Sequence, residues 1–339
     1  MKKLKIAGLS NQDTGVFNYR ILQPLRGVAK QKLATVHHMP YWGQHVTHFT
    51  SKEFIDYFAL EGKWADVVFS TAACDRHYLS LLWGMKEQYG FKLVIDVDDD
   101  ILATHTEPNN PAYISYINQD ARYAEYFQMC VHKADLVTVS TEYLRQKMLP
   151  LNKNIVVVKN FIDPNFFSHK NKPDDVTLGF TGSGSHQGDW KMIEPTLKQL
   201  KEETDCKVKM LGPMQTTVCD EQTKWVDQLK HPKTLADMGF SIGLAPLKDS
   251  LMNRAKSNLR WLEYSAMKIP TVASDTLPFR EMENVIRVNE PEEWHDSLST
   301  LIHDKSYREK LGKQAYEEMR TNYDGNEQSR ILFNAINSL

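Results

Sequence analysis

Residues 253–274 hold the side chains whose types and spacing are best suited to chemistry. The segment is predicted to form a loop, a helix that begins near Lys256-Ser257, and a short buried strand, Thr271–Ser274. A lysine beside the unpaired N–H groups of a helix start makes an anion site, because the helix dipole also favours negative charge there. Glu263 lies about two turns further along the same helix face, so it can reach the group attached to the anion. A diphosphate at the helix start, with sugar hydroxyls held by the carboxylate behind it, describes a nucleotide-sugar.

A second candidate site is the loop after the predicted strand Thr177–Phe180, with the run Gly182-Ser-Gly-Ser-His186. Glycine permits positive φ and a close backbone approach to a ligand. Ser183, Ser185 and His186 can donate hydrogen bonds to phosphate or sugar oxygens. The run has neither the ending of a Walker loop nor the Gly-x-Gly-x-x-Gly spacing of a dinucleotide-binding loop.

The alternative for this loop is a flexible turn in which Ser185 or Asp189 caps the next helix. The helix start at Lys256, which is expected in the same domain, favours the ligand-binding interpretation.

A third candidate lies near the amino terminus, where another strand, loop and helix are predicted. This pattern places Gly15 and Arg20 at the carboxyl end of the first strand, where doubly wound domains bind ligands. Arg20 could hold a phosphate through two hydrogen bonds. A surface arginine in the first turns of the helix is the alternative.

Four clustered carboxylates, at Asp96 and Asp98-Asp-Asp100, follow the predicted strand Leu93–Val97. Such a cluster could hold Mg²⁺ or Mn²⁺. Strand alternation puts Asp96 and Asp98 on one face, however, so the four would not converge, and we expect no metal site. We expect instead that Asp98 or Asp99 faces a cleft between two domains and accepts a hydrogen bond from a substrate hydroxyl. A solvated acidic turn that caps the next helix is the alternative.

Strand-like and helix-like segments alternate along the chain, which predicts an α/β fold with parallel sheets. Two sets of strands are expected: Leu4–Leu9, Ala34–His37, Val67–Ser70, Leu93–Val97, Leu136–Val139 and Ile155–Val158; then Thr177–Phe180, Lys207–Leu211, Ile242–Ala245, Thr271–Ala273 and Val285–Val288. Amphipathic stretches between them predict helices, for example Phe17–Lys30, Tyr78–Tyr89, Tyr123–Lys133, Trp190–Glu203, Trp261–Met267 and Tyr307–Tyr323.

A polar segment separates the two sets, so two doubly wound domains are predicted, at residues 1–165 and 175–323. Residues 324–339 carry a helical stripe of apolar residues. This last helix either crosses back onto the first domain or belongs to the second.

The overall composition describes an ordinary globular chain. The formal net charge of the 339 residues is −2, and neither half is a basic block, so a large nonspecific nucleic-acid surface is not indicated. We expect no signal peptide and no membrane-spanning segment. The four cysteines lack metal-ligand spacing, which is typical of reduced thiols. A cytoplasmic protein is expected, either peripheral at the inner membrane face or in the cytoplasm of a phage-infected host.

Taken together, these motifs resemble the GT-B glycosyltransferases, closest to the retaining family 4-like group and to the variant found in short bacterial and bacteriophage proteins. The resemblance extends over roughly residues 4–275. Its residues are Gly15 with Tyr19-Arg20, Val97-Asp-Asp-Asp100, Ala134–Ser140, Gly182-Ser183 with His186, Ile242–Leu247, Lys256-Ser257, and Leu262-Glu-Tyr264 with Ile269–Ser274.

The resemblance implies two Rossmann-like domains that face a cleft, with the active site between them and no metal or other cofactor. The donor would meet the first domain at Gly15 and Arg20. The loop at Gly182, Ser183 and His186 would meet its diphosphate, together with Lys256 and the amides of Ser257, Asn258 and Leu259, while Glu263 would hold the ribose. Family members commonly carry a glutamate against the transferred sugar where this chain has Ala255. Many carry His-Asp where it has Asp98-Asp99, so these two are the catalytic candidates.

The expected function is transfer of a sugar from a nucleotide-sugar, UDP-linked by family frequency, to an acceptor hydroxyl with retention. The acceptor is either a cell-envelope or lipid-linked glycan precursor or a hydroxymethylated base in phage DNA. Two alternatives remain open, a GT-B epimerase that acts on UDP-sugar without an acceptor and a non-catalytic sugar- or nucleotide-binding protein.

Overall fold

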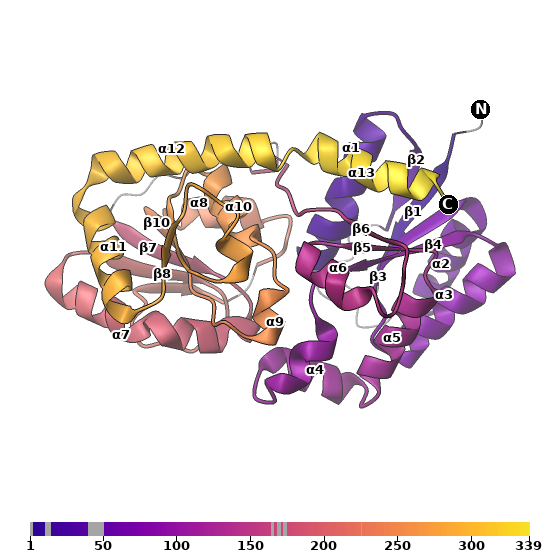
Figure 1. Cartoon of the computed structure of the whole chain (residues 1–339), viewed down its shortest axis with the longest axis horizontal. Helices are drawn as coiled ribbons and strands as arrows, with labels where there is room; N and C mark the ends of the chain where they lie inside the picture. Colours follow the sequence, from indigo (N-terminus) through magenta and orange to yellow (C-terminus); the bar gives the residue numbers. More distant parts are fainter. Residues whose placement is uncertain are drawn as a thin grey trace.

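The computed structural model describes residues 3–10, 15–39, 51–163, 166–167, 171, 175–224 and 226–339. Two six-stranded sheets form within these residues, and every strand pairing in both is parallel. Figure 1 shows the sheets side by side along the long axis, each surrounded by helices. This is the α/β arrangement that the alternating pattern predicts.

The first sheet has the strand order β2-β1-β3-β4-β5-β6. Its strands are β1 (Lys5–Leu9), β2 (Thr35–His38), β3 (Val67–Thr71), β4 (Lys92–Val97), β5 (Leu136–Val139) and β6 (Ile155–Val157). Its helices are η1 (Phe17–Leu22), α1 (Gln23–Lys30), α2 (Lys52–Trp64), α3 (Arg76–Tyr89), η2 (Ile101–Thr106), α4 (Pro111–Gln119), α5 (Tyr123–Lys133) and α6 (Glu142–Met148).

The second sheet has the strand order β12-β11-β10-β7-β8-β9. Its strands are β7 (Thr177–Thr181), β8 (Lys207–Leu211), β9 (Glu221–Thr223), β10 (Ile242–Ala245), β11 (Thr271–Ser274) and β12 (Ile286–Val288). The remaining helices are η3 (Gly184–His186), α7 (Gln187–Glu203), α8 (His231–Asp237), α9 (Leu251–Arg254), α10 (Leu259–Ala266), η4 (Leu277–Phe279), α11 (Pro291–His303), α12 (Lys305–Asn322) and α13 (Gly325–Asn337).

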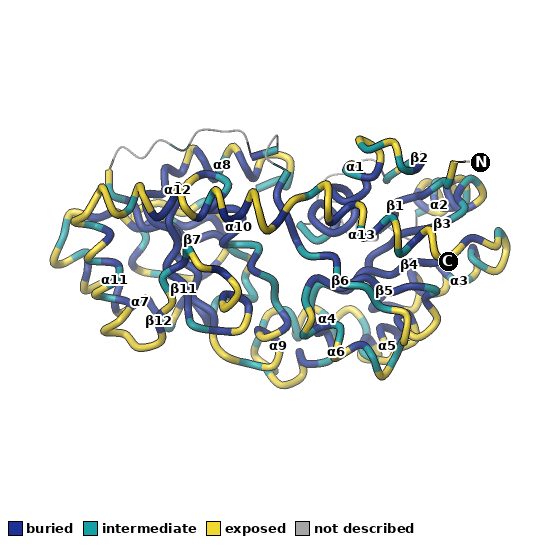
Figure 2. The backbone as a smooth tube through the Cα atoms, turned by 45° about the horizontal axis from the view of Figure 1, so that its top comes forward, coloured by how far each residue is buried: buried dark blue, intermediate teal, exposed yellow. Residues whose placement is uncertain are grey.

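The central strands are buried on both faces, as Figure 2 shows for each half of the molecule. Their apolar side chains pack against the flanking helices in separate cores for the two sheets. This explains why most strands could be predicted, since a strand covered on both faces has a continuous apolar sequence. The edge strand β9 is the polar segment Glu221–Thr223, and the sequence analysis missed it.

Two predicted helices begin differently in the structure. The segment expected to be one α-helix over Phe17–Lys30 opens with a π-helical stretch, Phe17–Leu22, before α1 starts at Gln23. The helix expected near Lys256-Ser257 begins at Leu259, with Asn258 at its N-cap. π-Helical turns such as those of Phe17–Leu22 are rare and often occur at functional sites.

The last helix, α13, lies beside α1 of the first sheet (Figure 1). A Cβ on Gly27 of α1 would lie 2.0 Å from Ser329 Oγ, so only glycine allows the two helices to pack this closely. Leu332 and Ile336 of α13 are buried in the first core. The chain therefore completes the second sheet and then returns to cover the first.

Candidate functional site

A cavity of about 460 Å³ lies between the two sheets. Its volume is in the range that holds small-molecule ligands. The first sheet contributes the segment before η1 and the end of β4, and the second contributes the loops after β7 and β8 and the start of α10. Predicted site residues that line it are Gly15, Asp98, Asp99, Gly182, Ser183, His186, Lys256, Ser257, Leu259 and Glu263.

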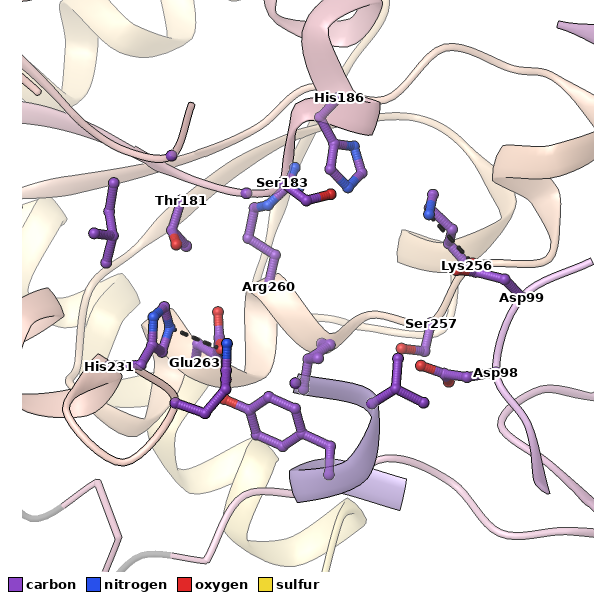
Figure 3. A pocket seen from close by; sticks show the side chains of 18 of the residues that line it. Asp98, Asp99, Thr181, Ser183, His186, His231, Lys256, Ser257, Arg260 and Glu263 are labelled. Carbon is purple, nitrogen blue, oxygen red and sulfur yellow. Dashed lines mark hydrogen bonds and ion pairs between the residues drawn. The ribbon is translucent and has the colours of Figure 1, made fainter. Parts of the chain in front are cut away.

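Two cations, Lys256 and Arg260, line the middle of the cavity (Figure 3). Burial lowers the pKa of Arg260, and its guanidinium lies over the Phe180 ring, 4.5 Å from the centroid. No carboxylate of the described residues lies within 4.0 Å of it. Lys256 Nζ lies 3.2 Å from Asp99 Oδ1. A partly buried guanidinium that lacks its own counter-ion favours an anionic ligand here.

The first turn of α10 lies beside these cations. Within the described part of the chain, the N–H groups of Ser257 and Asn258 have no acceptor. Such groups bear the positive end of the helix dipole and can donate to phosphate oxygens. The Ser257 hydroxyl accepts a 2.7 Å hydrogen bond from Asn160 Nδ2, which fixes this turn against the first sheet.

Glu263 and the side chains that contact it form the other end of the cavity. Tyr19 OH donates to Glu263 Oε1 over 2.6 Å, and His231 Nε2 lies 3.1 Å from the same oxygen, at an angle unsuited to a hydrogen bond. Burial raises the pKa of Glu263, but His231, the Tyr19 hydrogen bond and Arg260 outweigh it, and the net pKa is below the ordinary value. Glu263 is therefore an ionised acceptor within the cavity.

Asp98 and Asp99 enter the cavity from the first sheet, opposite the Glu263 end (Figure 3). Burial raises the pKa of Asp98 to about 6, and Asp99 and Asp96 add to this while Arg20 opposes it. Asn160 Nδ2 donates to Asp98 Oδ1 over 3.4 Å. Asp98 is thus a carboxyl group that changes protonation near neutral pH, beside a salt bridge between Asp99 and Lys256.

The glycine loop is shaped by close backbone packing. A Cβ on Gly212 would lie 2.2 Å from the Gly182 carbonyl oxygen, and a Cβ on Gly182 would lie 3.0 Å from Arg260 Nη2. Neither Gly182 nor Gly184 has positive φ. Gly182 and Gly212 are instead needed because a Cβ at either position would be too close to neighbouring atoms.

His186 points from this loop into the cavity (Figure 3). Its Nδ1 lies 2.8 Å from Asp189 Oδ2. Burial, Arg260 and Lys256 lower the pKa of His186 to about 4, although Asp189 acts in the opposite direction. Asp189 therefore contacts the imidazole and does not cap the next helix with its side chain.

Arg20 does not line the cavity, and both interpretations of it from the sequence are wrong. The side chain is buried, and Nε and Nη2 donate to the two carboxylate oxygens of Asp96 over 3.0 and 2.8 Å. Nη1 donates to the Val158 carbonyl and to Asn160 Oδ1. Buried charge requires such pairing, so Arg20 is a structural residue that joins η1 to β4 and to the end of β6. Because Asp96 is the buried partner of Arg20, it is not one of the carboxylates available to a ligand.

Asn258 also lies outside the cavity lining. Its side chain is buried and its Nδ2 donates to Met282 Sδ over 3.5 Å. Only its backbone, at the N-cap of α10, faces the predicted anion site.

Sequence reasoning missed several residues of this site: Tyr19 and His231 around Glu263, Asp189 beside His186, and Arg260. Arg260 could have been found, because it precedes Glu263 by three residues and so lies on the same face of the predicted helix. Tyr19 and His231 are 212 positions apart in the chain, and no local pattern connects them.

Residues 191–333 match the model of the glycosyl transferase-like family. An alpha-glucosyltransferase solved in complex with UDP has a TM-score of 0.69 at 12% identity, covering 98% of this chain and 100% of that chain. The chain has the GT-B fold.

Two further structures share this fold with the chain. HepE of Anabaena, in complex with UDP, has a TM-score of 0.59 at 13% identity and covers all of both chains. TarM has a TM-score of 0.59 at 15% identity, covering 84% of this chain and 58% of that chain. A search of curated proteins by sequence finds no significant match. Among the described residues, no helix combines the length and apolar character needed to cross a membrane.

Proposed function

We propose that this protein is a glycosyltransferase that moves a sugar from a UDP-sugar to an acceptor hydroxyl, with retention of the anomeric configuration. The observation that carries the proposal is the pair of cations Lys256 and Arg260 at the start of α10, within a cavity between two doubly wound sheets. Arg260 lacks a carboxylate partner among the described residues, so the ligand supplies the negative charge.

The rest of the cavity suits the parts of such a donor. Glu263, ionised and held by Tyr19, accepts hydrogen bonds from the ribose hydroxyls. The loops after β7 and β8 offer apolar side chains and backbone edges, including Leu211 and Pro213, on which a base can lie. Both the alpha-glucosyltransferase and HepE were solved in complex with UDP, which supports the choice of nucleotide.

In this arrangement the bond from the sugar to the diphosphate breaks while Lys256, Arg260 and the N–H groups of α10 offset the charge that develops on the diphosphate. Preorganised donors of this kind commonly supply several kcal/mol of transition-state stabilisation. Asp98 and Asp99, from the opposite sheet, orient the attacking hydroxyl or stabilise positive charge on the sugar. These roles, and retention, agree with the family resemblance.

The acceptor is a hydroxyl group of one of two classes. One related structure holds DNA with a HMU base, and another holds alpha-GlcNAc-glycerol. We propose that residues 1–165 form the acceptor-side domain, that residues 175–323 form the donor domain, and that the helix of residues 324–339 belongs to the first. Separate incubations with hydroxymethylated DNA and with glycan or lipid-linked precursors assign the acceptor class.

The decisive experiment is product analysis of UDP-sugars incubated with and without these acceptor pools. Release of UDP together with a glycosylated acceptor supports transfer, and the anomeric coupling of the product tests retention. An epimerised UDP-sugar or free isomerised sugar without any acceptor would instead assign the epimerase. Binding of UDP with no turnover under any condition would assign a binding protein.

A further inference from the structure

His186 and Asp189 form a buried pair beside the phosphate-binding cations. Asp189 Oδ2 meets His186 Nδ1 at 2.8 Å, while Asp189 Oδ1 accepts from Lys248 N–H and from Asn253 Nδ2 at 2.9 and 3.1 Å. Burial raises the pKa of Asp189, but His186 and the other donors lower it below the ordinary value. An ionised carboxylate can only accept, so His186 Nδ1 carries the proton.

The second imidazole nitrogen, Nε2, therefore presents a lone pair to the cavity. The cations around it, Arg260 and Lys256, hold the imidazole in its neutral form, since they and burial lower the pKa of His186 to about 4. A neutral imidazole with this tautomer cannot donate to a phosphate through Nε2. This tautomer favours an acceptor role for His186 over the donor role expected from the sequence.

The position of His186 indicates which ligand group supplies the proton. Figure 3 shows the imidazole on the side of Lys256, while Glu263, where the ribose is proposed to bind, lies at the opposite end of the cavity. Beyond the diphosphate, the donor carries the transferred sugar, whose hydroxyl groups can donate to an acceptor. Ala255, which stands where related enzymes have a sugar-binding glutamate, is fully buried in the first core and offers no acceptor.

We propose that His186 Nε2 accepts a hydrogen bond from a hydroxyl of the transferred sugar, and that Asp189 is the positioning residue that sets this tautomer. The inference rests on the proposed function and names the part of the second domain that recognises the sugar. The neutral acceptor His186 Nε2 then distinguishes a nucleotide-sugar from the free nucleotide, while the cations bind the diphosphate that both ligands carry.

Two substitutions test the roles of the two imidazole nitrogens separately. In His186→Asn, the amide Nδ2 stands in for Nδ1 and keeps the hydrogen bond to Asp189, while the acceptor toward the cavity is lost. In Asp189→Asn, Oδ1 still accepts from Lys248 and Asn253, but the new amide at the Oδ2 position donates to His186 Nδ1. The proton of the imidazole must then move to Nε2, which turns the acceptor into a donor.

The test is calorimetry of the full chain with UDP, UDP-glucose, UDP-galactose and UDP-N-acetylglucosamine. Both variants should bind UDP within about twofold of the wild type. The UDP-sugar that the wild type binds best should lose about tenfold in affinity, the scale of one hydrogen bond in a buried site. Nitrogen NMR of labelled histidine should place the His186 proton on Nδ1 in the wild type and on Nε2 in Asp189→Asn.

His295→Asn is the matched control, because His295 also contacts a carboxylate, that of Glu203, but at the surface far from the cavity. This control variant should change neither the affinity for UDP nor the affinity for the UDP-sugar. Equal losses of UDP and UDP-sugar in His186→Asn would show a phosphate contact and overturn the inference, as would no loss of either. A wild-type proton on Nε2 would also overturn it, even if Asp189→Asn does not fold. Failure of the wild type to bind UDP would instead reject the proposed function.

Discussion

Arg260 shows how a single side chain points to the ligand of this site. Its guanidinium is partly buried, lies over the Phe180 ring, and has no carboxylate within ion-pair distance among the described residues. By contrast Arg20, which the sequence made a candidate phosphate ligand, already has its counter-ion in Asp96. The two arginines differ in whether a carboxylate of the protein lies beside them. Only an arginine without such a carboxylate is available to bind an anionic ligand.

We therefore expect both Lys256→Ala and Arg260→Ala to weaken the binding of UDP and UDP-sugar alike. A hydrogen bond to a charged group contributes about 1.5–3 kcal/mol, so the dissociation constants should rise by roughly 10- to 150-fold. Calorimetry with UDP measures this. Lys224→Ala is a suitable control, because Lys224 also lines the cavity but is exposed, and unchanged affinity in both test variants would reject the diphosphate site.

Asp98 predicts a pH dependence. Burial raises its pKa from 3.8 to about 6, so the carboxyl group is protonated below this pH and ionised above it. If the ionised form assists the acceptor hydroxyl, turnover falls as the pH drops through about 6. The same shift means that Asp98 stabilises the fold below about pH 4 and that this stabilisation is lost as the pH rises through 6.

Asp98→Asn should accordingly remove the acidic limb of the pH profile and lower turnover by roughly 100-fold, the scale of acid–base and positioning effects. UDP affinity should change little, because the donor is held by the second sheet. Asp99→Asn is the partner variant, and normal turnover in both would reduce the acidic run to a solvated turn.

At the scale of elements, the site depends on how closely two loops approach each other and α10. Gly182, after β7, lies against Gly212, after β8, and against Arg260 of α10. A side chain at Gly182 would meet the Phe180 ring at 2.9 Å and Arg260 Nη2 at 3.0 Å. The loop thus confines the guanidinium by close packing and not by a hydrogen bond.

Gly182→Ala should displace Arg260 and weaken UDP binding by about tenfold, while the free energy of unfolding drops by no more than about 1–3 kcal/mol, as is typical of overpacking. Titration with UDP and chemical denaturation check the two quantities. Gly184→Ala is the matched control, because its added Cβ would lie 3.7 Å from Pro213 Cγ, an ordinary contact. A loss of affinity of the same size in both variants would contradict the argument.

At the scale of the whole molecule, contacts across the cavity join the two sheets. Tyr19 of the first half binds Glu263, Asp99 pairs with Lys256, and Asn160 binds Ser257. Each of these contacts joins a proposed donor-binding residue to the first sheet. The donor site is therefore formed by both halves, although most of its residues belong to the second.

The return of α13 to the first sheet makes its own prediction. Leu332→Ala removes a fully buried side chain from the first core and should cost about 2–5 kcal/mol. Hydrogen exchange should show lost protection in β1 and α1 before β7 and α7. Leu298→Ala, a fully buried leucine of the second sheet's core, should give the reverse order. Protection lost equally in both halves would mean that the two sheets unfold as one unit.

The sequence by itself determined most of the strands and helices, the two sheets, and ten of the residues that line the cavity. Glu263 belongs to α10, Lys256 lies just before the start of that helix, and the Gly182 loop follows a buried strand, so local periodicity and loop composition suffice to find them. The carboxyl ends of parallel strands share one edge, which places these segments together once the fold class is known.

Only the tertiary structure decided which charges are already paired. Arg20 and Asp96 are 76 positions apart, Tyr19 and Glu263 are 244 apart, and the polar edge strand β9 gains its pairing only beside β8. Nothing in the local sequence of either partner reveals such a pair, because an arginine reads the same whether a carboxylate or a phosphate lies beside it. The free energy of a buried charge depends on its neighbours in space, and those are set by the packing of the two sheets.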